Sequence, residues 1–421
     1  MDFKFIQILL IIGLKLIKLT KERNRLIQGL IVVGAGLAVP QVLAYAASVI
    51  AARLLVPPEF GAFGAMQGIT QIGTPIGLAI QAIAARRLVK NSANKHHDLL
   101  RFGFEISIAV MLATLLISFP LSSIFNIDYI VLVLTIGAIA PFVFISTQLG
   151  IAQGKEFYLK LAGIYIVFGI GRSISAIVGL FIYPELISVG IGFFGGTVLS
   201  AIVAHFILGN SKKFWKTERA DESIKELWRA TQALFALYVL VNIDVLLARI
   251  VLTPEESGIY TVGMLVAKIA FFMPQAITVV LFPKMGRNDS SALRLAVLGT
   301  SLIGAGYIAV TYFASEFVVN AIGGSGYAEL YSEVWLFAIE GSLFAVLQVL
   351  LYGRIAREDT KVSILLWVGS ILSTISVWLI ASDTVVTVVS ALIGVTFILV
   401  IIAAITELRH RANERSDPSH T

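Results

Sequence analysis

The sequence predicts an all-α integral membrane protein with about 12 transmembrane helices. We expect two six-helix bundles related by a pseudo-twofold axis along the membrane normal. Three observations support this fold class. The chain of 421 residues is 57% hydrophobic and 14% charged, with a mean hydropathy of +0.90. Long apolar runs separate its charged segments, and one short phrase is written twice, far apart in the chain.

The apolar runs are long enough to cross a bilayer. A helix of about 20 apolar residues spans a hydrocarbon core about 30 Å thick. A soluble domain typically carries about 25% charged residues, so this composition is poorly suited to water. The predicted spans are 26–52, 60–85, 102–127, 129–154, 161–184, 186–209, 230–252, 257–283, 295–315, 330–353, 362–382 and 384–406.

The basic residues predict the orientation of these spans. Of the 32 Lys and Arg residues, all but four fall in loops or termini on one side of a twelve-span arrangement. The four exceptions are Arg53 and Arg249 on the opposite side, and Arg172 and Lys268 within spans. The positive-inside rule therefore predicts a multi-pass protein of the cytoplasmic membrane with both termini in the cytoplasm. The net charge of +6 favours contact with anionic membrane lipids rather than nucleic acid.

Five segments follow from this arrangement. The N-terminal segment is interrupted by Lys15 and Lys18, which favours an amphipathic helix on the cytoplasmic membrane surface. A cleaved signal peptide ending at Ala44-Tyr45-Ala46 is the disfavoured alternative, because the run stays apolar to Ala52. The predicted segments are 1–25 (N-terminal segment), 26–209 (first bundle), 210–229 (cytoplasmic linker), 230–406 (second bundle) and 407–421 (cytoplasmic tail).

The repeated phrase predicts the internal symmetry. "AARLLVPPEFGAF" at 51–63 matches "LARIVLTPEESGIY" at 247–260, with Arg53 on Arg249 and Pro58 on Pro254 at an offset of 196. Each copy follows the first span of a predicted six-span half. Thr253 to Glu256 also has the form of a helix capping box with proline at the first helical position. An even number of spans per half gives both halves the same orientation, as in transporters with parallel repeats.

Four charged residues lie deep within predicted spans. Arg172 and Lys268 lie near mid-membrane, where each costs roughly 2.5–3.5 kcal/mol on insertion scales. Asp244 and Glu340 are the deep carboxylates. Two interpretations remain open: internal ion pairs between these residues, or a hydrated cavity in which the two cations meet an anionic substrate. In the second case Asp244 and Glu340 are candidate ion-coupling groups.

Arg53 and Arg249 break the positive-inside pattern at equivalent positions of the two halves. One interpretation is that both side chains extend to the outer headgroups. The other places them at the outer mouth of a substrate pathway, where they bind an anionic headgroup. We therefore count Arg53 and Arg249, with Arg172 and Lys268, as candidate substrate-binding residues.

Other sequence features exclude several kinds of chemistry. The absence of cysteine excludes disulfides and thiolate metal sites, and the five histidines lack metal-ligand spacing. "GIGFFG" at 190–195 lies inside an apolar run with no preceding strand, so it does not indicate a dinucleotide site. No catalytic residue, metal or cofactor is therefore predicted.

Four stretches resemble a known family: "LAYAASVIAARLLVPPEFGAFGAMQGI", "AQGKEFYLKLAG", "VNIDVLLARIVLTPEESGIYTVGMLVAKI" and "VLFPKM". They are similar to the polysaccharide-transporter branch of the multidrug/oligosaccharidyl-lipid/polysaccharide flippase superfamily, over about residues 26–406. The resemblance implies a two-bundle fold with a central cavity. It also implies a non-enzymatic flippase for polyprenyl-linked oligosaccharide, with glycan polymerase and glycosyltransferases as further partners.

Three other functions remain open from the sequence. One is a non-transporting scaffold for glycan assembly, which would show no lipid translocation in liposomes. A multidrug or small-cation exporter of the same superfamily would need an acidic cavity for cationic ligands. A membrane glycosyltransferase or polymerase would need a catalytic platform, for which the short outer loops leave little room. The sign of the cavity charge distinguishes the exporter from the flippase, and formation of a glycosidic bond would identify an enzyme.

Overall fold

The structure, a computed structural model, is helical throughout the residues that it describes, which are 32–34, 36–90, 96–209, 224–274, 277, 290–355, 361–380 and 384–416. The predicted N-terminal surface helix at 1–25 lies outside these residues, as does most of the predicted linker. The first helix is the span Val32–Leu54, called the first span below. The helices that follow it in the first half are α2 (Pro57–Lys90), α3 (His96–Phe125), α4 (Tyr129–Gly137), α5 (Ile139–Gly154), α6 (Tyr158–Ile182) and α7 (Leu186–Leu208).

The second half begins with two helices that carry the second copy of the repeated phrase. Its elements are α8 (Ile224–Val251), α9 (Pro254–Phe272), α11 (Ser290–Phe313), α12 (Ser315–Ile322), the 3-10 helix η3 (Ser325–Ser332), α13 (Val334–Ile355), α14 (Lys361–Ile380) and α15 (Val385–Ser416). Within the described residues, eleven helices are long and apolar enough to cross a membrane. The prediction of an all-helical, multi-pass membrane protein is therefore confirmed.

Two predicted spans differ in detail from the helices. The span predicted at 129–154 is divided into α4 and α5 at Ala138, which caps both helices. The span predicted at 257–283 corresponds to α9, and most of its second half lies outside the described residues. α9 is not among the eleven candidate spans, and it carries Glu255, Glu256 and Lys268 within 19 residues.

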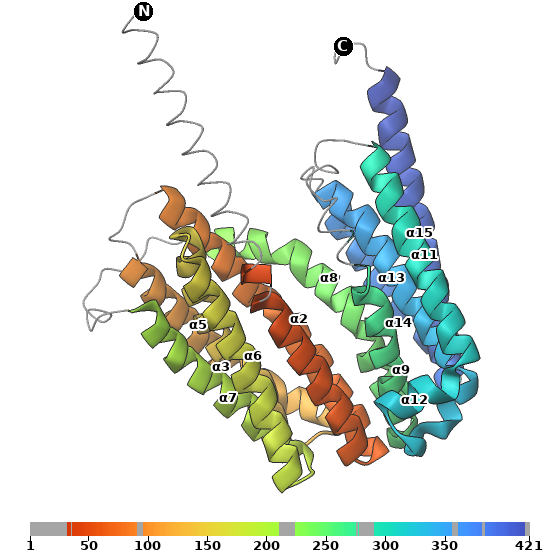
Figure 1. The fold of residues 1–421 in the computed structure, drawn as a ribbon, viewed down its shortest axis with the longest axis horizontal. Helices are drawn as coiled ribbons and strands as arrows, with labels where there is room; N and C mark the ends of the chain where they lie inside the picture. The colour runs from red at the N-terminus through yellow and green to blue at the C-terminus, as the bar shows by residue number, and fades with distance from the viewer. Residues whose placement is uncertain are drawn as a thin grey trace, which may run out of the picture.

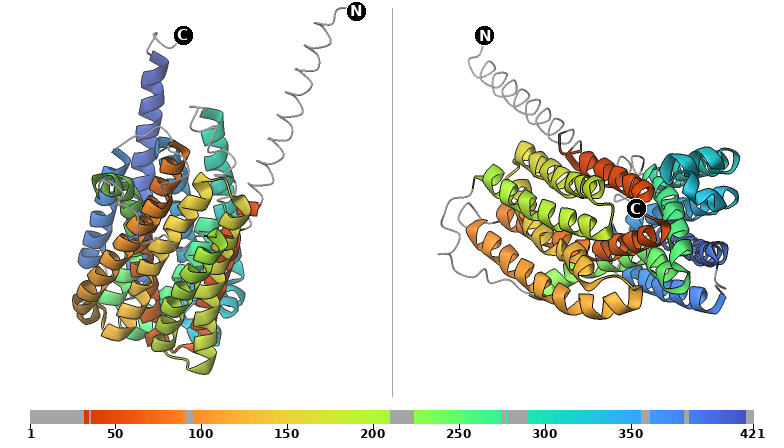
Figure 2. Two further views of the ribbon diagram at one scale, coloured as in Figure 1. Left: turned by 90° about the vertical axis from the view of Figure 1, so that its left-hand side faces the viewer. Right: turned by 90° about the horizontal axis from the view of Figure 1, so that it is seen from below.

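The helices pack as two groups that meet along α2 (Figure 1). In the first group α6 packs on α7 and α2 on α5, whereas in the second α13 packs on α9, α11 and α15. The first span lies against α6, where close approach leaves no room for a Cβ at Gly36 or Gly169. The view from below in Figure 2 shows the same two groups beside each other. The predicted boundaries of the two bundles stay a prediction.

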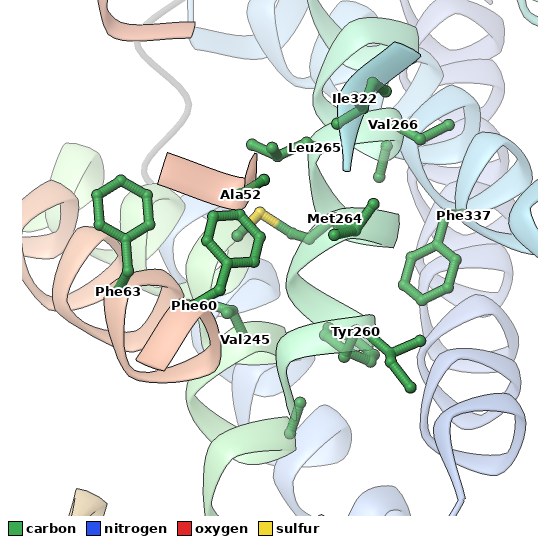
Figure 3. Close-up of a cluster of buried hydrophobic side chains, with 14 of the residues drawn as sticks. Ala52, Phe60, Phe63, Val245, Tyr260, Met264, Leu265, Val266, Ile322 and Phe337 are labelled. Carbon is green, nitrogen blue, oxygen red and sulfur yellow. The ribbon is translucent and has the colours of Figure 1, made fainter. Parts of the chain in front are cut away.

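A buried apolar cluster joins the two groups where α2 and α9 begin (Figure 3). Phe60 and Phe63 of α2 stack with ring centroids 5.6 Å apart. Tyr260 of α9 meets Phe337 of α13 edge to face, with centroids 5.1 Å apart. All four rings are at most 2% exposed. This cluster joins the first turns of the two helices of the repeated phrase across the junction of the two groups.

The outer surface of the bundle is strongly apolar. Phe313 of α11 is 85% exposed, and Ile182 and Leu379 are each 79% exposed. Large apolar side chains of this kind are costly in water but favourable against lipid tails. This surface is therefore the one expected of helices surrounded by hydrocarbon.

Candidate functional site

The two copies of the repeated phrase contact each other. A Cβ on Gly258 of α9 would collide with the carbonyl oxygen of Pro57, and a Cβ on Gly61 of α2 would collide with Ser257 Oγ. The helix beginnings therefore approach closely only because both positions are glycine. We call this contact, at the end of the molecule where α2 and α9 begin, the seam. Each copy of the phrase therefore packs against the other.

The predicted capping box of the second copy is present. Thr253 Oγ1 accepts a hydrogen bond from the Glu256 backbone N–H at 3.3 Å, and Glu256 Oε2 accepts one from the Thr253 N–H at 3.1 Å. Pro254 lies between them, at the first position of α9. These bonds satisfy backbone donors that have no partner within the helix. The helix therefore begins at a fixed residue and holds Gly258 at the seam.

Both arginines of the phrase donate hydrogen bonds to carbonyl oxygens at the seam. Arg53 Nη2 donates to the carbonyl oxygens of Asn320 at 3.3 Å and Ala321 at 2.6 Å. Arg249 Nε donates to the carbonyl oxygen of Phe125 at 3.0 Å, and its Nη1 donates to that of Pro58 at 3.2 Å. In this conformation both guanidinium groups are engaged with protein. Their predicted role in binding substrate at the outer mouth stays a prediction.

Nearby, the 3-10 helix η3 contributes a tyrosine to the seam. The ring of Tyr327 is 3% exposed and meets Phe60 edge to face, with centroids 6.2 Å apart. Burial raises the pKa of Tyr327 to about 12, because the charged phenolate is disfavoured away from water. The phenol therefore stays neutral at physiological pH.

Arg172 lies on α6 in the first group, half-buried and directed toward α2 and α7. Its Nη2 donates to Gln67 Oε1 at 2.9 Å, and its guanidinium carbon lies 4.6 Å from the centre of the Phe193 ring. A polar amide and an aromatic face lower the cost of a buried cation without neutralising it. Gln67 and Phe193 were not predicted, because a single glutamine or phenylalanine in an apolar run carries no distinguishing pattern.

Lys268 lies on α9 in the second group, and it lines a small cavity with Asp244 of α8 and Glu340 of α13. The cavity has a volume of about 20 Å³. That volume holds about one water. The three charged residues predicted from depth in the second half thus meet at one place.

Three of the four carboxylate oxygens in this cavity accept no hydrogen bond. Asp244 is 4% exposed and Glu340 is 1% exposed. Asp244 Oδ1 and both oxygens of Glu340 accept no hydrogen bond, and neither residue forms an ion pair within 4 Å in the described part of the chain. The hydroxyl of Tyr260, which is also buried and unpaired, lies close enough to feel both charges. A buried polar group without a partner is costly and marks a functional position.

The two cations lie in opposite groups, and each is beside the junction at α2: Arg172 contacts Gln67 of α2, and Lys268 lies on α9, which packs on α2. No ion pair within 4 Å joins either cation to a carboxylate among the residues described. Of the two interpretations open from the sequence, direct pairing is therefore absent in this conformation. The Arg172 guanidinium, in contact with an amide and an aromatic ring, keeps its positive charge and can attract an anion, whereas two carboxylates share the cavity with Lys268.

A second polar group lies where α2, α5 and α6 meet in the first half. Gln81 Nε2 of α2 donates to Gln153 Oε1 of α5 at 3.0 Å and to the Tyr165 hydroxyl of α6 at 2.8 Å. Gln81 and Gln153 come from helices that pack against each other through Gly150. Amide and hydroxyl groups of this kind bind sugar hydroxyls by hydrogen bonds. No group of three or more potential metal ligands occurs among the described residues.

Comparison with known proteins identifies the family and the fold. The family described as "Polysaccharide biosynthesis protein" matches residues 50–332. Among curated proteins, none matches the chain. Several solved structures share the fold, and the three reported next represent them.

Lipid II flippase MurJ, in an inward closed conformation, has a TM-score of 0.68 at 14% identity, over 89% of this chain and 87% of that chain. A multidrug resistance MATE family transporter of the MOP superfamily, inward-facing, has a TM-score of 0.68 at 16% identity, over 92% and 99%. A MOP superfamily transporter from Pyrococcus furiosus, described by a reverse polarity of its binding pocket, has a TM-score of 0.61 at 15% identity, over 93% and 96%. These likenesses confirm the predicted fold class.

Proposed function

We propose that this chain, which belongs to the polysaccharide biosynthesis protein family and has the fold of MOP superfamily transporters, is a flippase for lipid-linked oligosaccharide. It moves a polyprenyl-pyrophosphate-linked oligosaccharide, such as the repeat unit of a surface polysaccharide, across the cytoplasmic membrane. The termini face the cytoplasm, and transport proceeds by alternating access. No covalent bond changes in this process, in agreement with the prediction that the chain is not an enzyme.

The observation that carries the proposal is the pair of cations at the interface of the two groups. Arg172 approaches from the first group and Lys268 from the second, and neither is ion-paired among the described residues. Guanidinium and ammonium groups are the protein's donors for phosphate oxygens. A pyrophosphate bound between them would be neutralised from both sides, while Gln81 and Gln153 are placed to meet the sugars.

The conformation of this structure fits one state of such a cycle. The seam is closed, and the cavity beside Lys268 has room for about one water. An oligosaccharide needs far more space, so the two groups must move apart to admit it. Binding energy from the pyrophosphate favours the state in which both cations reach it, because a ligand shifts a population only by its differential affinity.

Asp244 and Glu340 are the candidate coupling groups. Their unpaired carboxylates lie beside Lys268 in the same cavity. A proton or sodium ion bound there would neutralise charge that the fold otherwise buries at high cost. Ion binding and substrate binding would then both change the charge around Lys268, which links the two events. Membrane lipids, glycan polymerase and glycosyltransferases are the further proposed partners.

The rival function is a small-cation exporter, and one observation favours it. The cavity beside Lys268 contains two carboxylates and one ammonium group, so its local charge is negative when both acids are ionised. Arg172, across the interface, opposes a cationic ligand. A purified protein that exports cationic dyes but not lipid-linked oligosaccharide would identify the exporter.

The test is transport in liposomes that contain the purified protein and a fluorescent polyprenyl-pyrophosphate oligosaccharide. The wild-type protein is expected to expose the labelled sugar to an impermeant quencher on the far leaflet. Arg172→Ala with Lys268→Ala should abolish this movement, whereas Arg294→Ala, an exposed arginine of α11, should not. Undiminished movement in the double variant would contradict the proposal.

A further inference from the structure

The two seam arginines occupy equivalent positions and bind equivalent acceptors. Arg53 and Arg249 are related by the offset of 196 that relates the repeated phrases. Their acceptors follow the same offset: Arg249 binds the carbonyl oxygen of Phe125, and Arg53 binds that of Ala321. The two contacts are therefore copies of each other. A random surface contact would not repeat in this way.

Each contact crosses between the two groups of helices. Arg53 ends the first span, which packs on α6 of the first group, and it reaches α12 of the second group. Arg249 lies in the last turn of α8 in the second group. It reaches the last residue of α3 and the first turn of α2 in the first group. The contacts thus run in opposite directions, and neither can persist if the groups separate at this end.

The acceptors are placed to bind a guanidinium group. Phe125 is the last residue of α3, and the following Asn126 has a φ of 50°, the left-handed conformation that ends helices. Asn320 and Ala321 lie in the last turn of α12. Carbonyl oxygens in a last turn lack a helical donor and carry the negative end of the helix dipole. An arginine supplies both the missing donors and the opposite charge.

We propose that Arg53 and Arg249 form two reciprocal clasps that hold the seam closed and must release before this end of the molecule can open. The inference rests on the alternating access proposed above. The clasps and the glycine contact between Gly61 and Gly258 act on the same interface, so they open together. In the open state the guanidinium groups exchange carbonyl acceptors for water or for an anionic group leaving the cavity, the role that the sequence predicts for them.

The closed and open states can be distinguished with a single thiol, because the chain has no native cysteine. Thr261 of α9 is 1% exposed and faces Gly64 of α2 across the seam. In a Thr261→Cys background, an impermeant maleimide added to sealed vesicles from the seam side should label the thiol slowly. Replacing both clasp arginines by alanine should raise the initial labelling rate about tenfold, and each single replacement by less.

Matched variants separate loss of the clasps from loss of the fold. Arg294→Ala in the same background should leave the labelling rate unchanged. Arg53→Lys and Arg249→Lys keep the charge but lose the forked donors, so together they should give an intermediate rate. A labelling rate that stays at the background value in both the alanine and the lysine pairs would overturn the clasps. So would an equal rise in Arg294→Ala.

The outcome is independent of the transport assay. A raised labelling rate in a protein that moves no lipid-linked oligosaccharide would leave the clasps standing and refute the flippase. An unchanged rate in a protein with intact transport would refute the clasps alone. The two proposals can therefore fail separately.

Discussion

The charged side chains at the seam are hydrogen-bonded, whereas those in the cavity beside Lys268 have few or no partners. At the seam, the guanidinium groups of Arg53 and Arg249 are bonded to backbone carbonyl oxygens across the interface. At the cavity, the carboxylates of Asp244 and Glu340 accept few or no hydrogen bonds, and Lys268 is not ion-paired among the described residues. Satisfied charges hold two surfaces together, whereas unsatisfied charges are available to a ligand. The molecule thus separates closure from recognition.

The largest effect is expected in the apolar cluster at the seam. Phe337 is fully buried against Tyr260, so Phe337→Ala should lower the free energy of unfolding by about 3–5 kcal/mol through lost burial and a cavity. Phe313→Ala is the control, because this ring is 85% exposed on the apolar surface. Thermal unfolding in detergent checks both. Equal losses would mean that the cluster is not the core of the seam.

The next largest loss of stability is expected where the two copies of the repeated phrase approach each other closely. Gly258→Ala places a Cβ against the backbone of Pro57, which cannot yield as a flexible side chain would. The expected loss is about 1–3 kcal/mol. Gly163→Ala on α6 has nothing within 4 Å of its added Cβ and should be neutral or stabilising by about 0.5–1 kcal/mol. Unfolding midpoints that fall alike in the two variants would contradict the tight seam.

Removing a carboxylate from the cavity beside Lys268 should raise the free energy of unfolding rather than lower it. Glu340→Gln removes a buried carboxylate that accepts no hydrogen bond, so it should raise the free energy of unfolding by about 1–2 kcal/mol and abolish ion-coupled transport. Glu105→Gln, by contrast, removes the partner of an Arg101 ion pair 3.1 Å long at the surface. It should cost about 0.3–0.5 kcal/mol. A destabilised Glu340→Gln would show that the carboxylate serves the fold.

The smallest effect concerns the start of α9. Thr253→Ala removes the side chain that caps the helix and should cost about 1 kcal/mol. Thr374→Ala, within α14, removes only a bond to the carbonyl oxygen of Ser370 and should cost less. Chemical denaturation of the two variants measures the difference. The same cost in both would mean that the cap does not help to position the seam.

The sequence predicts the seam and the cavity unequally well. The repeated phrase predicts two related halves, and the Thr253 capping box forms as expected, because both signals are local. Depth in the membrane identifies Arg172, Lys268, Asp244 and Glu340, since a charge within an apolar run is conspicuous. The three residues of the second half among these share one cavity.

The sequence does not predict which groups the charged side chains bind. The acceptors of Arg53 and Arg249 are backbone carbonyls, which every residue carries and no pattern marks. Gln67, which binds Arg172, is a single amide within an apolar helix. The division of the span at 129–154 also escapes prediction, because Ala138 is a good helix former and no turn residue marks the break.

The most direct test of this division of roles is binding of a short-chain polyprenyl-pyrophosphate oligosaccharide to the protein in detergent, where both ends are accessible. Replacing Arg172 and Lys268 together by glutamine should weaken binding about 100-fold, because two charge-assisted contacts to phosphate are lost. Replacing Arg53 and Arg249 together by alanine should leave the affinity within a few-fold of wild type, because these arginines hold the seam. Equal weakening in both pairs, or none in the first, would contradict the account.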